Sequence, residues 1–406
     1  MTQVVIAGAG PAGATLAFLL ARRGIGVTLL ERQTDFEREF RGEVLMPSGV
    51  DAFRQMRLDQ ALDALPQARV RGVDFYRGAR RLFHLVLTPE QIGTFGPRVV
   101  SQPAMLEMLT AQAARFPSFR LERGVTVRDL VQREGRVVGL RGDATDGPRE
   151  FEGDVVIGGD GRASILRRRA GLDEKRSPQV FDVLWAKVPL PDFMRGTGTA
   201  RGYLGRGHLA LAFPTYDERL QIAWIIEKGS FGELRRHGID GWIAEMAAHV
   251  SPDLAEHLRA RRAEFTQPFL LDVVCDRLVR WTAPGLLLLG DAAHPMSPVG
   301  GQGLNIALRD ALVAANHLVP VLLRGAAPEA IDAAARRVQE ERLVEVSGIQ
   351  RLQQIPPRVV FGQTWWGRLL GGGLLPILAR TGLPQRLLAS TFRKFALGVA
   401  EVELEV

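Results

Sequence analysis

Cysteine is almost absent from this chain. Cys275 is the only one among 406 residues, so an intramolecular disulfide, a thiolate metal cluster and a dithiol redox centre are all excluded. A single thiol is typical of proteins kept in a reducing compartment, and it predicts a cytoplasmic, bacterial-type location.

Lysine is also scarce, although the chain is basic, with a formal charge of +7 and a sequence pI near 10.2. Only four of its 52 basic residues are lysines, and the arginines are scattered, the longest run being Arg167 to Arg169. Nucleic-acid binding needs a basic patch or stripe, so we expect no nucleic-acid partner. No spacing of His, Cys, Asp and Glu predicts a metal site, and no Ser, His and Asp arrangement predicts a nucleophilic triad.

Long uninterrupted hydrophobic runs are missing as well. The most apolar stretch near the start, QVVIAGAGPAGATLAFLL at residues 3–20, is broken by Gly8, Gly10, Pro11 and Gly13. It also lacks the basic segment that precedes the core of a signal peptide, so neither a signal peptide nor a transmembrane span is expected. The pattern instead predicts a buried strand at 4–7, a tight turn and a helix over about 12–22.

The turn carries the pattern G-x-G-x-x-G, from Gly8 to Gly13. The first glycine permits the tight turn, the second lets the backbone approach a pyrophosphate, and the third allows close packing of helix on strand. Glu31 ends the next predicted strand, 18 residues beyond Gly13, where a carboxylate can accept the hydroxyls of a ribose. A dinucleotide site follows, with NAD and FAD both open at this point.

The rest of the chain divides by composition. Residues 71–97 predict a hairpin, and 179–275 read as a second, antiparallel sheet with a helical insert near 238–262. A buried strand at 285–289 precedes a glycine-rich loop and a helix, and residues 328–353 are helical again. We therefore expect three parts: a discontinuous dinucleotide-binding domain (1–70, 98–178 and 276–330), a substrate-binding sheet (71–97 and 179–275) and a C-terminal helical segment (331–406).

Two later motifs carry a family resemblance. DVVIGGDGRASILRR contains Asp160, Gly161, Ser164 and Arg167, and LLLLGDAAHPMSPVGGQGLNIALRDA begins at Leu286. Together with the first motif, they resemble the fingerprints of group A FAD-dependent aromatic hydroxylases, of the para-hydroxybenzoate hydroxylase and ubiquinone-biosynthesis hydroxylase type. The resemblance implies an α/β fold, in which a Rossmann-like FAD-binding domain is joined to an antiparallel-sheet substrate domain and C-terminal helices.

The resemblance also implies the cofactors and the reaction. FAD would be resident and non-covalent, NADPH or NADH would be a transient reductant, and O₂ the cosubstrate. The protein would hydroxylate or epoxidise a hydrophobic, electron-rich small molecule through a flavin C4a-hydroperoxide. The expected cofactor-binding residues are Gly8, Gly10, Pro11, Ala12, Gly13, Glu31, Arg32, Arg41, Gln102, Val127, Asp160, Gly161, Gly290, Asp291, Pro298, Gly301, Gln302, Gly303, Leu304 and Asn305.

Physical chemistry supports two of these expectations independently. Asp291 directly follows an apolar strand, so its carboxylate would stand at the carboxyl edge of the sheet, within reach of a ribitol hydroxyl. Gly300, Gly301 and Gly303 leave the backbone bare where a helix begins, so its N–H groups can stabilise negative charge on a flavin pyrimidine ring.

The sequence identifies no catalytic residue. The candidates to face the ligand are His84, Arg201, Tyr203, Phe213, Trp224, His294 and Pro298. His294 is expected to hold its loop, and a tyrosine-based proton relay has only Tyr76, Tyr203 and Tyr216 to draw on.

Several alternatives stay open. The segment IAWIIEKG loosely resembles prenyl reductases, while the flavin halogenase pattern W-x-W-x-I-P is incomplete here. A non-enzymatic FAD-binding redox sensor is the alternative from another class. The apolar, basic segment containing Trp365 and Trp366 is a candidate for peripheral membrane contact, and monomer and homodimer are equally open.

Overall fold

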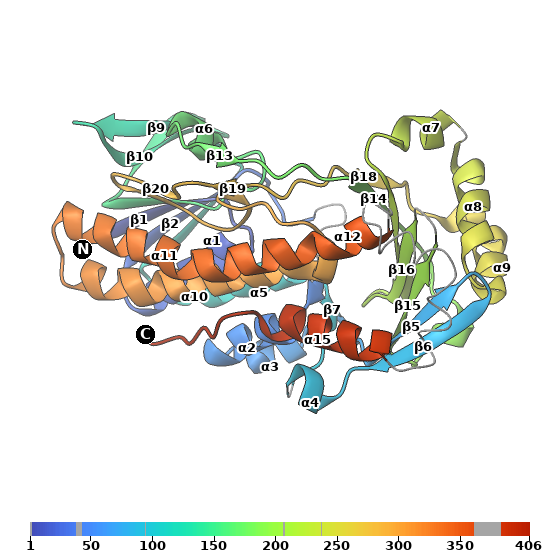
Figure 1. Ribbon diagram of the computed structural model, residues 1–406. Coiled ribbons are helices and arrows are strands. Elements are labelled where there is room, and N and C mark those ends of the chain that lie inside the picture. Colours follow the sequence, from blue (N-terminus) through green and yellow to red (C-terminus); the bar gives the residue numbers. More distant parts are fainter. Residues whose placement is uncertain (1, 38–42, 94, 206–207, 237, 361–382) are drawn as a thin grey trace.

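The computed structural model describes residues 2–37, 43–93, 95–205, 208–236, 238–360 and 383–406. Two sheets lie at opposite ends of the molecule, and long helices run alongside the first of them toward the second (Figure 1). The first sheet is built around the N-terminal strand, and the second around the aromatic-rich strands in the middle of the chain.

The first sheet has six strands in the order β20-β21-β12-β1-β2-β8. Its strands are β1 (Gln3–Ala7), β2 (Gly26–Glu31), β8 (Phe119–Arg123), β12 (Val155–Gly158), β20 (Thr282–Ala283) and β21 (Leu286–Leu288). All neighbours run parallel except β20 and β21. From β1 the chain winds outward to β2 on one side and later returns to β12 on the other. This creates the switch point beside which open α/β sheets bind ligands.

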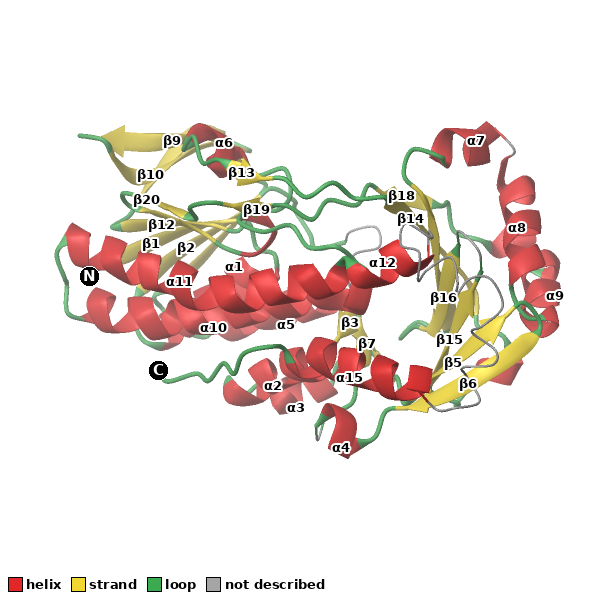
Figure 2. Ribbon diagram, viewed as in Figure 1, coloured by secondary structure: helices red, strands yellow, loops and turns green. Residues whose placement is uncertain are grey.

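Helices and a smaller sheet cover the two faces of this parallel sheet (Figure 2). α1 (Pro11–Arg22) packs against α5 (Gln102–Ala113) and α10 (Gln302–Leu323), and α11 (Pro328–Gln353) packs on α10. The covering sheet has the order β11-β10-β9, from β9 (Thr126–Arg133), β10 (Arg136–Ala144) and β11 (Gly147–Glu152). Strand β12 is consequently buried along its whole length, and β1 is buried from Val4 onward.

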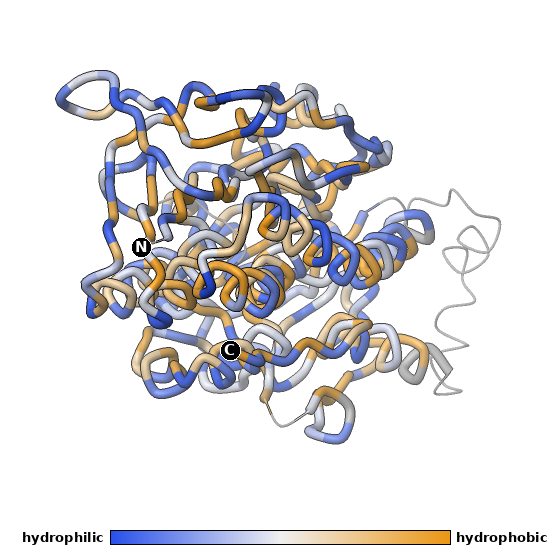
Figure 3. Tube along the Cα trace, turned by 90° about the vertical axis from the view of Figure 1, so that its left-hand side faces the viewer, coloured by the Kyte–Doolittle hydropathy of each residue, from blue (hydrophilic) through white to orange (hydrophobic). Residues whose placement is uncertain are grey.

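One apolar helix, Val299–Leu323, is the only one in the described part of the chain with the length and composition to cross a membrane. Within its most apolar window, 72% is buried inside the molecule. It is α10 with the short turn before it, and its apolar side chains belong to the core shared with α1 and the parallel sheet. Figure 3 shows apolar and polar residues alternating along the segments, as expected when each has one buried face.

The second sheet has seven strands in the order β18-β14-β17-β16-β15-β5-β6. They are β5 (Gly72–Arg77), β6 (Arg80–Val86), β14 (Phe181–Pro189), β15 (Thr199–Leu204), β16 (Leu209–Pro214), β17 (Arg219–Glu227) and β18 (Phe269–Leu271). The pairing of β15 with β5 is parallel and every other pairing is antiparallel, so the sheet is mixed where a wholly antiparallel one was expected. The exception arises because the β5–β6 hairpin joins the sheet from a separate, earlier part of the chain.

This mixed sheet has an outer and an inner face. α7 (Phe231–Arg236), α8 (Gly238–His249) and α9 (Pro252–Ala260) come from the insert, and α8 and α9 pack on the outer face (Figure 1). The inner face carries a separate apolar cluster, which Val299 of the first domain's glycine-rich loop joins. The inner face is therefore the one turned toward the motif residues.

The remaining elements include two small sheets, β3-β7-β4 and β13-β19. The α-helices and strands among them are β3 (Val44–Leu45), α2 (Pro47–Gln55), α3 (Asp59–Asp63), β4 (Gln67–Arg69), α4 (Pro89–Ile92), β7 (Arg98–Val100), α6 (Ile165–Arg169), β13 (Glu174–Lys175), β19 (Arg277–Leu278), α12 (Ile355–Val360) and α15 (Leu383–Leu397). The segment proposed for membrane contact lies mostly at 361–382, outside the described residues.

Candidate active site

The Gly8 to Gly13 turn is held by close backbone contacts. A Cβ on Gly8, whose φ is +92°, would lie 2.5 Å from the carbonyl oxygen of Gly159, and one on Gly13 would lie 2.0 Å from that of Gly8. Gly10 differs, because its φ is an ordinary −71° and a Cβ there would meet nothing closer than 4.0 Å. Gly8 and Gly13 are thus required by the fold itself, whereas nothing in the described protein requires Gly10.

α1 begins at Pro11 without a side-chain cap. The N–H groups of Ala12 and Gly13 have no acceptor within the helix, because the first turn of any helix leaves its donors unpaired. Gly8, Gly10 and Pro11 are only half-buried, so this helix end is accessible. It has the form of an anion site for a phosphate group.

Glu31 lies beside this turn and is 5% exposed. Its Oε2 accepts a hydrogen bond from the N–H of Ala9 at 3.0 Å, and its Oε1 accepts one from Gln33. Val127 lies on β9 and is half-buried against the core. It is close to Glu31 because Val125, two residues before it, donates a hydrogen bond to the carbonyl of Glu31. Arg32 is exposed, and Arg41 lies outside the described residues.

Asp160 follows β12 and faces the same turn. Its Oδ2 accepts hydrogen bonds from the N–H groups of Ile165, where α6 begins, and of Leu166. Its Oδ1 is buried and has no hydrogen-bond partner among the described residues, and burial raises the pKa of this carboxyl group. Gly161 next to it has a positive φ of +79°. A Cβ added there would meet no atom within 4 Å, so the adjoining space is open.

Asp291 follows β21, the next strand of the sheet. Gly290 has a φ of +58° and a Cβ there would lie 3.5 Å from that of Ala12, so this segment lies directly against the start of α1. The carboxylate of Asp291 is half-buried and accepts a hydrogen bond from Nε of Arg162 at 3.0 Å. Arg162 lies within the Asp160 motif, but the sequence did not single it out.

The glycine-rich loop turns sharply into α10. Gly300 and Gly301 both have positive φ, +74° and +61°, and the helix starts without a side-chain cap. Pro298, Gly301 and Gly303 are half-buried, whereas Leu304 is buried in the core. The uncapped N–H groups of α10 and the exposed loop therefore form a second site suited to negative charge.

Buried polar side chains fix the conformation of this loop through hydrogen bonds to backbone groups. Gln302 donates through Nε2 to the carbonyls of Gly300 and Phe395, and its Oε1 is buried without a hydrogen-bond partner among the described residues. Asn305 accepts from the N–H of Met46 and donates to the carbonyls of Val44 and Gly301. Asn305 was predicted to bind the cofactor; its side-chain amide is engaged by the protein, and its place on α10 keeps it near the site.

His294 and Asp310 form the centre of a fully buried ionic network. Nε2 of His294 donates to Asp310 at 2.8 Å, and Asp310 also accepts from the N–H of Gly290 and from Nε of Arg342. Burial alone would raise the pKa of Asp310, but His294 and Arg342 overcome it and lower this pKa to about 2. Arg342 and Arg309 both contact Glu345, so the network connects α10 to α11. His294 thus supports the loop and does not face the open side of the site.

Four of the expected ligand-facing residues lie elsewhere. Tyr203 and Trp224 point to the outer face, where they pack in the cluster that includes Trp242 of α8. Arg201 pairs with Asp253 at the start of α9, and His84 pairs with Asp74 on the β5–β6 hairpin. Side-chain alternation decides this, because residues one apart on a strand point to opposite faces.

Phe213 lies on the inner face, 6.3 Å from Trp185 in an edge-to-face arrangement. Gln102 is the first residue of α5 and is 9% exposed, directly after the capping residue Ser101.

A polar cluster that the sequence did not reveal joins the inner face to the first domain. Nζ of Lys187 lies 3.4 Å from Glu43 and 3.3 Å from Asp217, and 5.0 Å from the ring centre of Tyr216. The hydroxyl of Tyr216 donates to Glu43 at 3.3 Å. Glu43 directly precedes Val44, which lies against Gly301, so the cluster adjoins the glycine-rich loop.

Burial sets the charge balance of this cluster. It raises the pKa of Glu43, against the opposing effect of Lys187, and together with Glu43 it raises the pKa of Tyr216 to about 12. Burial would also raise the pKa of Asp217, but the Thr215 hydrogen bond and Lys187 lower it. Tyr216 therefore stays protonated and Asp217 ionised at neutral pH.

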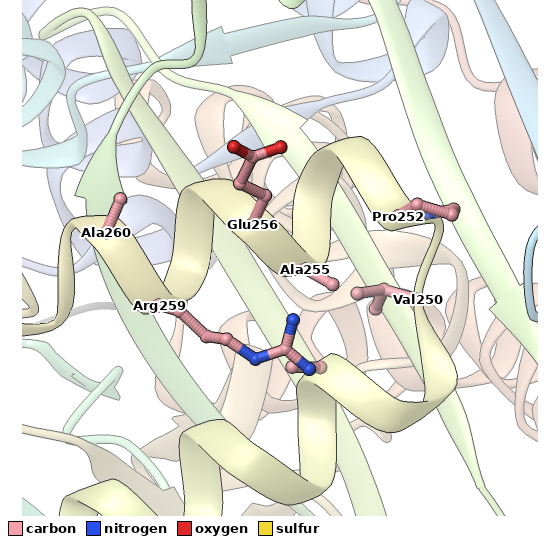
Figure 4. Close-up of a pocket in the computed structure, with 7 residues that line it drawn as sticks. Val250, Pro252, Ala255, Glu256, Arg259 and Ala260 are labelled. Atoms are coloured by element: carbon pink, nitrogen blue, oxygen red, sulfur yellow. The ribbon is translucent and has the colours of Figure 1, made fainter.

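One hollow lies apart from these residues. A cavity of about 770 Å³ runs between α8 and α9, lined by Ala247, Val250, Pro252, Ala255, Glu256, Arg259 and Ala260. Figure 4 shows Glu256 and Arg259 projecting from α9 beside it. It lies on the outer side of the mixed sheet and contains none of the motif residues.

The residues around the glycine-rich turn fit FAD. The backbone is bare at Gly10, a carboxylate stands at the end of β2, a second stands at the end of β21, and two uncapped helix ends point to the same region. These are the groups that a pyrophosphate, a ribose, a ribitol chain and an electron-accepting ring require.

Comparisons with known proteins place the chain among flavoproteins. The family model FAD_binding_3, described as an FAD binding domain, matches residues 1–344. The 6-methylpretetramide 4-monooxygenase of Streptomyces rimosus is 34% identical over 361 residues, which span 86% of this chain and 83% of that protein. Squalene monooxygenase SE1 of Panax ginseng is 25% identical over 337 residues, 79% of this chain and 59% of that protein.

Solved structures share the fold at low identity. The p-nitrophenol 4-monooxygenase PnpA from Pseudomonas putida DLL-E4 matches with a TM-score of 0.79 at 16% identity, covering 99% of this chain and 100% of that one. PqsL of P. aeruginosa, in complex with 2-aminobenzoylacetate, matches with a TM-score of 0.77 at 22% identity, over 91% and 99% of the two chains.

Proposed function

The chain belongs to the FAD-binding-domain family of FAD-dependent monooxygenases, and from this premise we propose that it is an NAD(P)H-consuming enzyme that inserts one oxygen atom of O₂ into an aromatic or similarly electron-rich small molecule. The observation that carries the proposal is the convergence of three motifs. The Gly8 turn, Asp160 and Asp291 follow neighbouring parallel strands, and the glycine-rich loop beside them packs on the inner face of the mixed sheet.

Each motif residue has a role in this proposal. The N-terminus of α1 would hold the pyrophosphate of FAD, Glu31 the adenosine ribose, and Asp291 the ribitol chain. The N-terminus of α10 would stabilise negative charge on the pyrimidine ring of the flavin. FAD, when bound, supplies the redox chemistry, accepting a hydride from NAD(P)H and activating O₂.

The inner face would bind the substrate and exclude water from the reacting region. Trp185, Phe213 and Ala223 lie on this face, and an apolar surface over the flavin protects reactive species from hydrolysis. Two relatives in the comparisons carry names that specify oxygenation, of 6-methylpretetramide and of p-nitrophenol, and the aromatic lining supports an aromatic substrate here as well.

Purified protein tests the proposal directly. We expect a yellow preparation or one that takes up added FAD, and NADPH or NADH oxidation that rises when a phenolic compound is present. Mass spectrometry of the product should show a gain of one oxygen. A gain of two hydrogens without O₂ would instead indicate a reductase, and a gain of halogen a halogenase. Bound FAD without turnover across a broad substrate panel would favour a redox sensor.

We also propose a cytoplasmic enzyme, with its oligomeric state and peripheral membrane contact as separate questions. Size-exclusion chromatography with light scattering would separate the monomer from the homodimer, and vesicle sedimentation would test contact with a membrane.

A further inference from the structure

Gln221 occupies the centre of the inner face of the mixed sheet. It lies on β17, paired in register with Lys187 on β14 and with Phe213 on β16. Cross-strand partners project from the same face, so these three side chains form one row. Trp185, two residues before Lys187 on β14, adds a ring on the same face.

The row faces the glycine-rich loop. Lys187 reaches Glu43 of the first domain, and Ala223, two residues beyond Gln221, belongs to the apolar cluster that Val299 joins. Residues two apart on a strand point to the same face and are about 7 Å apart. Gln221 therefore lies next to Ala223, which belongs to the apolar cluster at the loop.

The side chain of Gln221 is unsatisfied. It is 5% exposed, and its Oε1 has no hydrogen-bond partner among the described residues. Its polar neighbours contact other acceptors: Nζ of Lys187 lies 3.4 Å from Glu43 and 3.3 Å from Asp217, and the Tyr216 hydroxyl donates to Glu43. A buried acceptor left without a donor destabilises the protein, a cost that a ligand with a donor would remove.

We infer that Gln221 is a specificity-determining residue, whose Oε1 accepts a hydrogen bond from a hydroxyl or N–H group of the substrate while the ring system of the substrate lies against Trp185 and Phe213. This inference rests on the proposed function, since it assigns the inner face to the substrate. It selects substrates that carry a donor over those that do not, because an analogue without a donor leaves Gln221 unpaired in the complex.

The test compares two probes on the FAD-loaded protein: 2-naphthol and 2-methoxynaphthalene, which share a ring system and differ in the donor. Equilibrium dialysis gives both dissociation constants without turnover. The wild-type protein should bind 2-naphthol about tenfold more tightly, the ratio that corresponds to one hydrogen bond of about 1.4 kcal/mol. Gln221→Met, which keeps the side-chain length, should reduce that ratio to about 1–2 by weakening 2-naphthol alone.

Tyr203→Phe is the matched control, because it removes a buried hydroxyl from the outer face of the same sheet. It should keep the tenfold preference. Gln221→Leu provides a second variant should Gln221→Met fold poorly. Equal affinity of wild type for the two probes, no binding of 2-naphthol, or a preference retained in both Gln221 variants would overturn the inference. Failure of the proposed function would appear separately, as absence of FAD uptake or of oxygen insertion.

Discussion

At the scale of single residues, the two acids at the ends of strands have different surroundings. Glu31 is buried and already accepts hydrogen bonds from Ala9 and Gln33, so it also shapes the turn that it serves. Asp291 is half-exposed and contacts Arg162, whose guanidinium can move without disturbing a core. Substitution of Asp291 therefore separates binding from folding more cleanly.

We expect Asp291→Asn to weaken FAD binding by about 10- to 100-fold, because hydrogen bonds to a charged group contribute about 1.5–3 kcal/mol. The thermal midpoint of the FAD-free protein should change little, since the side chain is half-exposed. Titration of the apoprotein with FAD, followed by flavin fluorescence, measures the affinity. An unchanged dissociation constant would remove Asp291 from the cofactor site.

At the scale of elements, the Gly8 to Gly13 turn combines two demands in one motif. Gly13 is required because α1 begins so close to the end of β1 that a Cβ there would meet the carbonyl oxygen of Gly8. Gly10 also lacks a side chain, but no contact within the protein requires this. The close packing at Gly13 agrees with the role that the sequence predicts for the third glycine, and the role of Gly10 beside a pyrophosphate stays a prediction.

Gly13→Ala and Gly10→Ala should consequently affect different properties: the first the stability of the fold, the second the affinity for FAD. Gly13→Ala places a Cβ 2.0 Å from a carbonyl oxygen, which should destabilise the fold by about 3 kcal/mol or more and give little soluble protein. Gly10→Ala should leave the stability of the apoprotein within about 1 kcal/mol, because its backbone suits alanine.

The second substitution should still weaken FAD binding, because its methyl group stands where the pyrophosphate approaches. Chemical denaturation and FAD titration of the two variants give the comparison. Full FAD affinity in Gly10→Ala would show that this turn serves packing alone.

At the scale of the whole molecule, the network around Asp310 connects parts that are distant in the chain. It ties Gly290, beside the cofactor site, to α10 and α11, and Arg309 within it donates to the carbonyl of Ala400 near the C-terminus. Phe395 likewise packs on Gly300 and accepts from Gln302. The conformation of the glycine-rich loop thus depends on the C-terminal part of the described structure.

This network predicts a pH dependence of stability. The folded state lowers the pKa of Asp310 from 3.8 to about 2, so the unfolded chain takes up the proton first as the pH falls. The stabilisation is full above pH 4 and is lost as the pH falls toward 2. Asp310→Asn should cost about 3 kcal/mol at neutral pH and flatten the acid limb between pH 4 and 2.

Urea denaturation at a series of pH values measures both effects. Glu341→Gln is a suitable control. It removes an exposed carboxylate of α11 that pairs with His317 of α10, and it should change stability by less than about 1 kcal/mol. A wild-type-like acid limb in Asp310→Asn would assign the acid sensitivity to other carboxylates.

The sequence by itself determined the N-terminal strand-helix-strand unit, the glycine-rich turns and the family resemblance, because each of these depends on residues that are contiguous in the chain. Strand, turn and helix meet within one short segment at Gly8 to Gly13, and again at Asp291 to Gly303. The short-range pattern therefore specified where a cofactor would be held.

Only the tertiary structure decided which side chains face that site. β14 and β17 are buried on both faces, so their hydrophobic pattern carries no sign of which face looks inward, and Trp224, a candidate to face the ligand, packs on the outer face. The pairing of Lys187 with Glu43 joins segments far apart in the chain, and no local periodicity encodes it. Each glycine-rich turn could be predicted because it lies within one short segment, whereas the contacts of the inner face could not, because they join segments that are far apart in the chain.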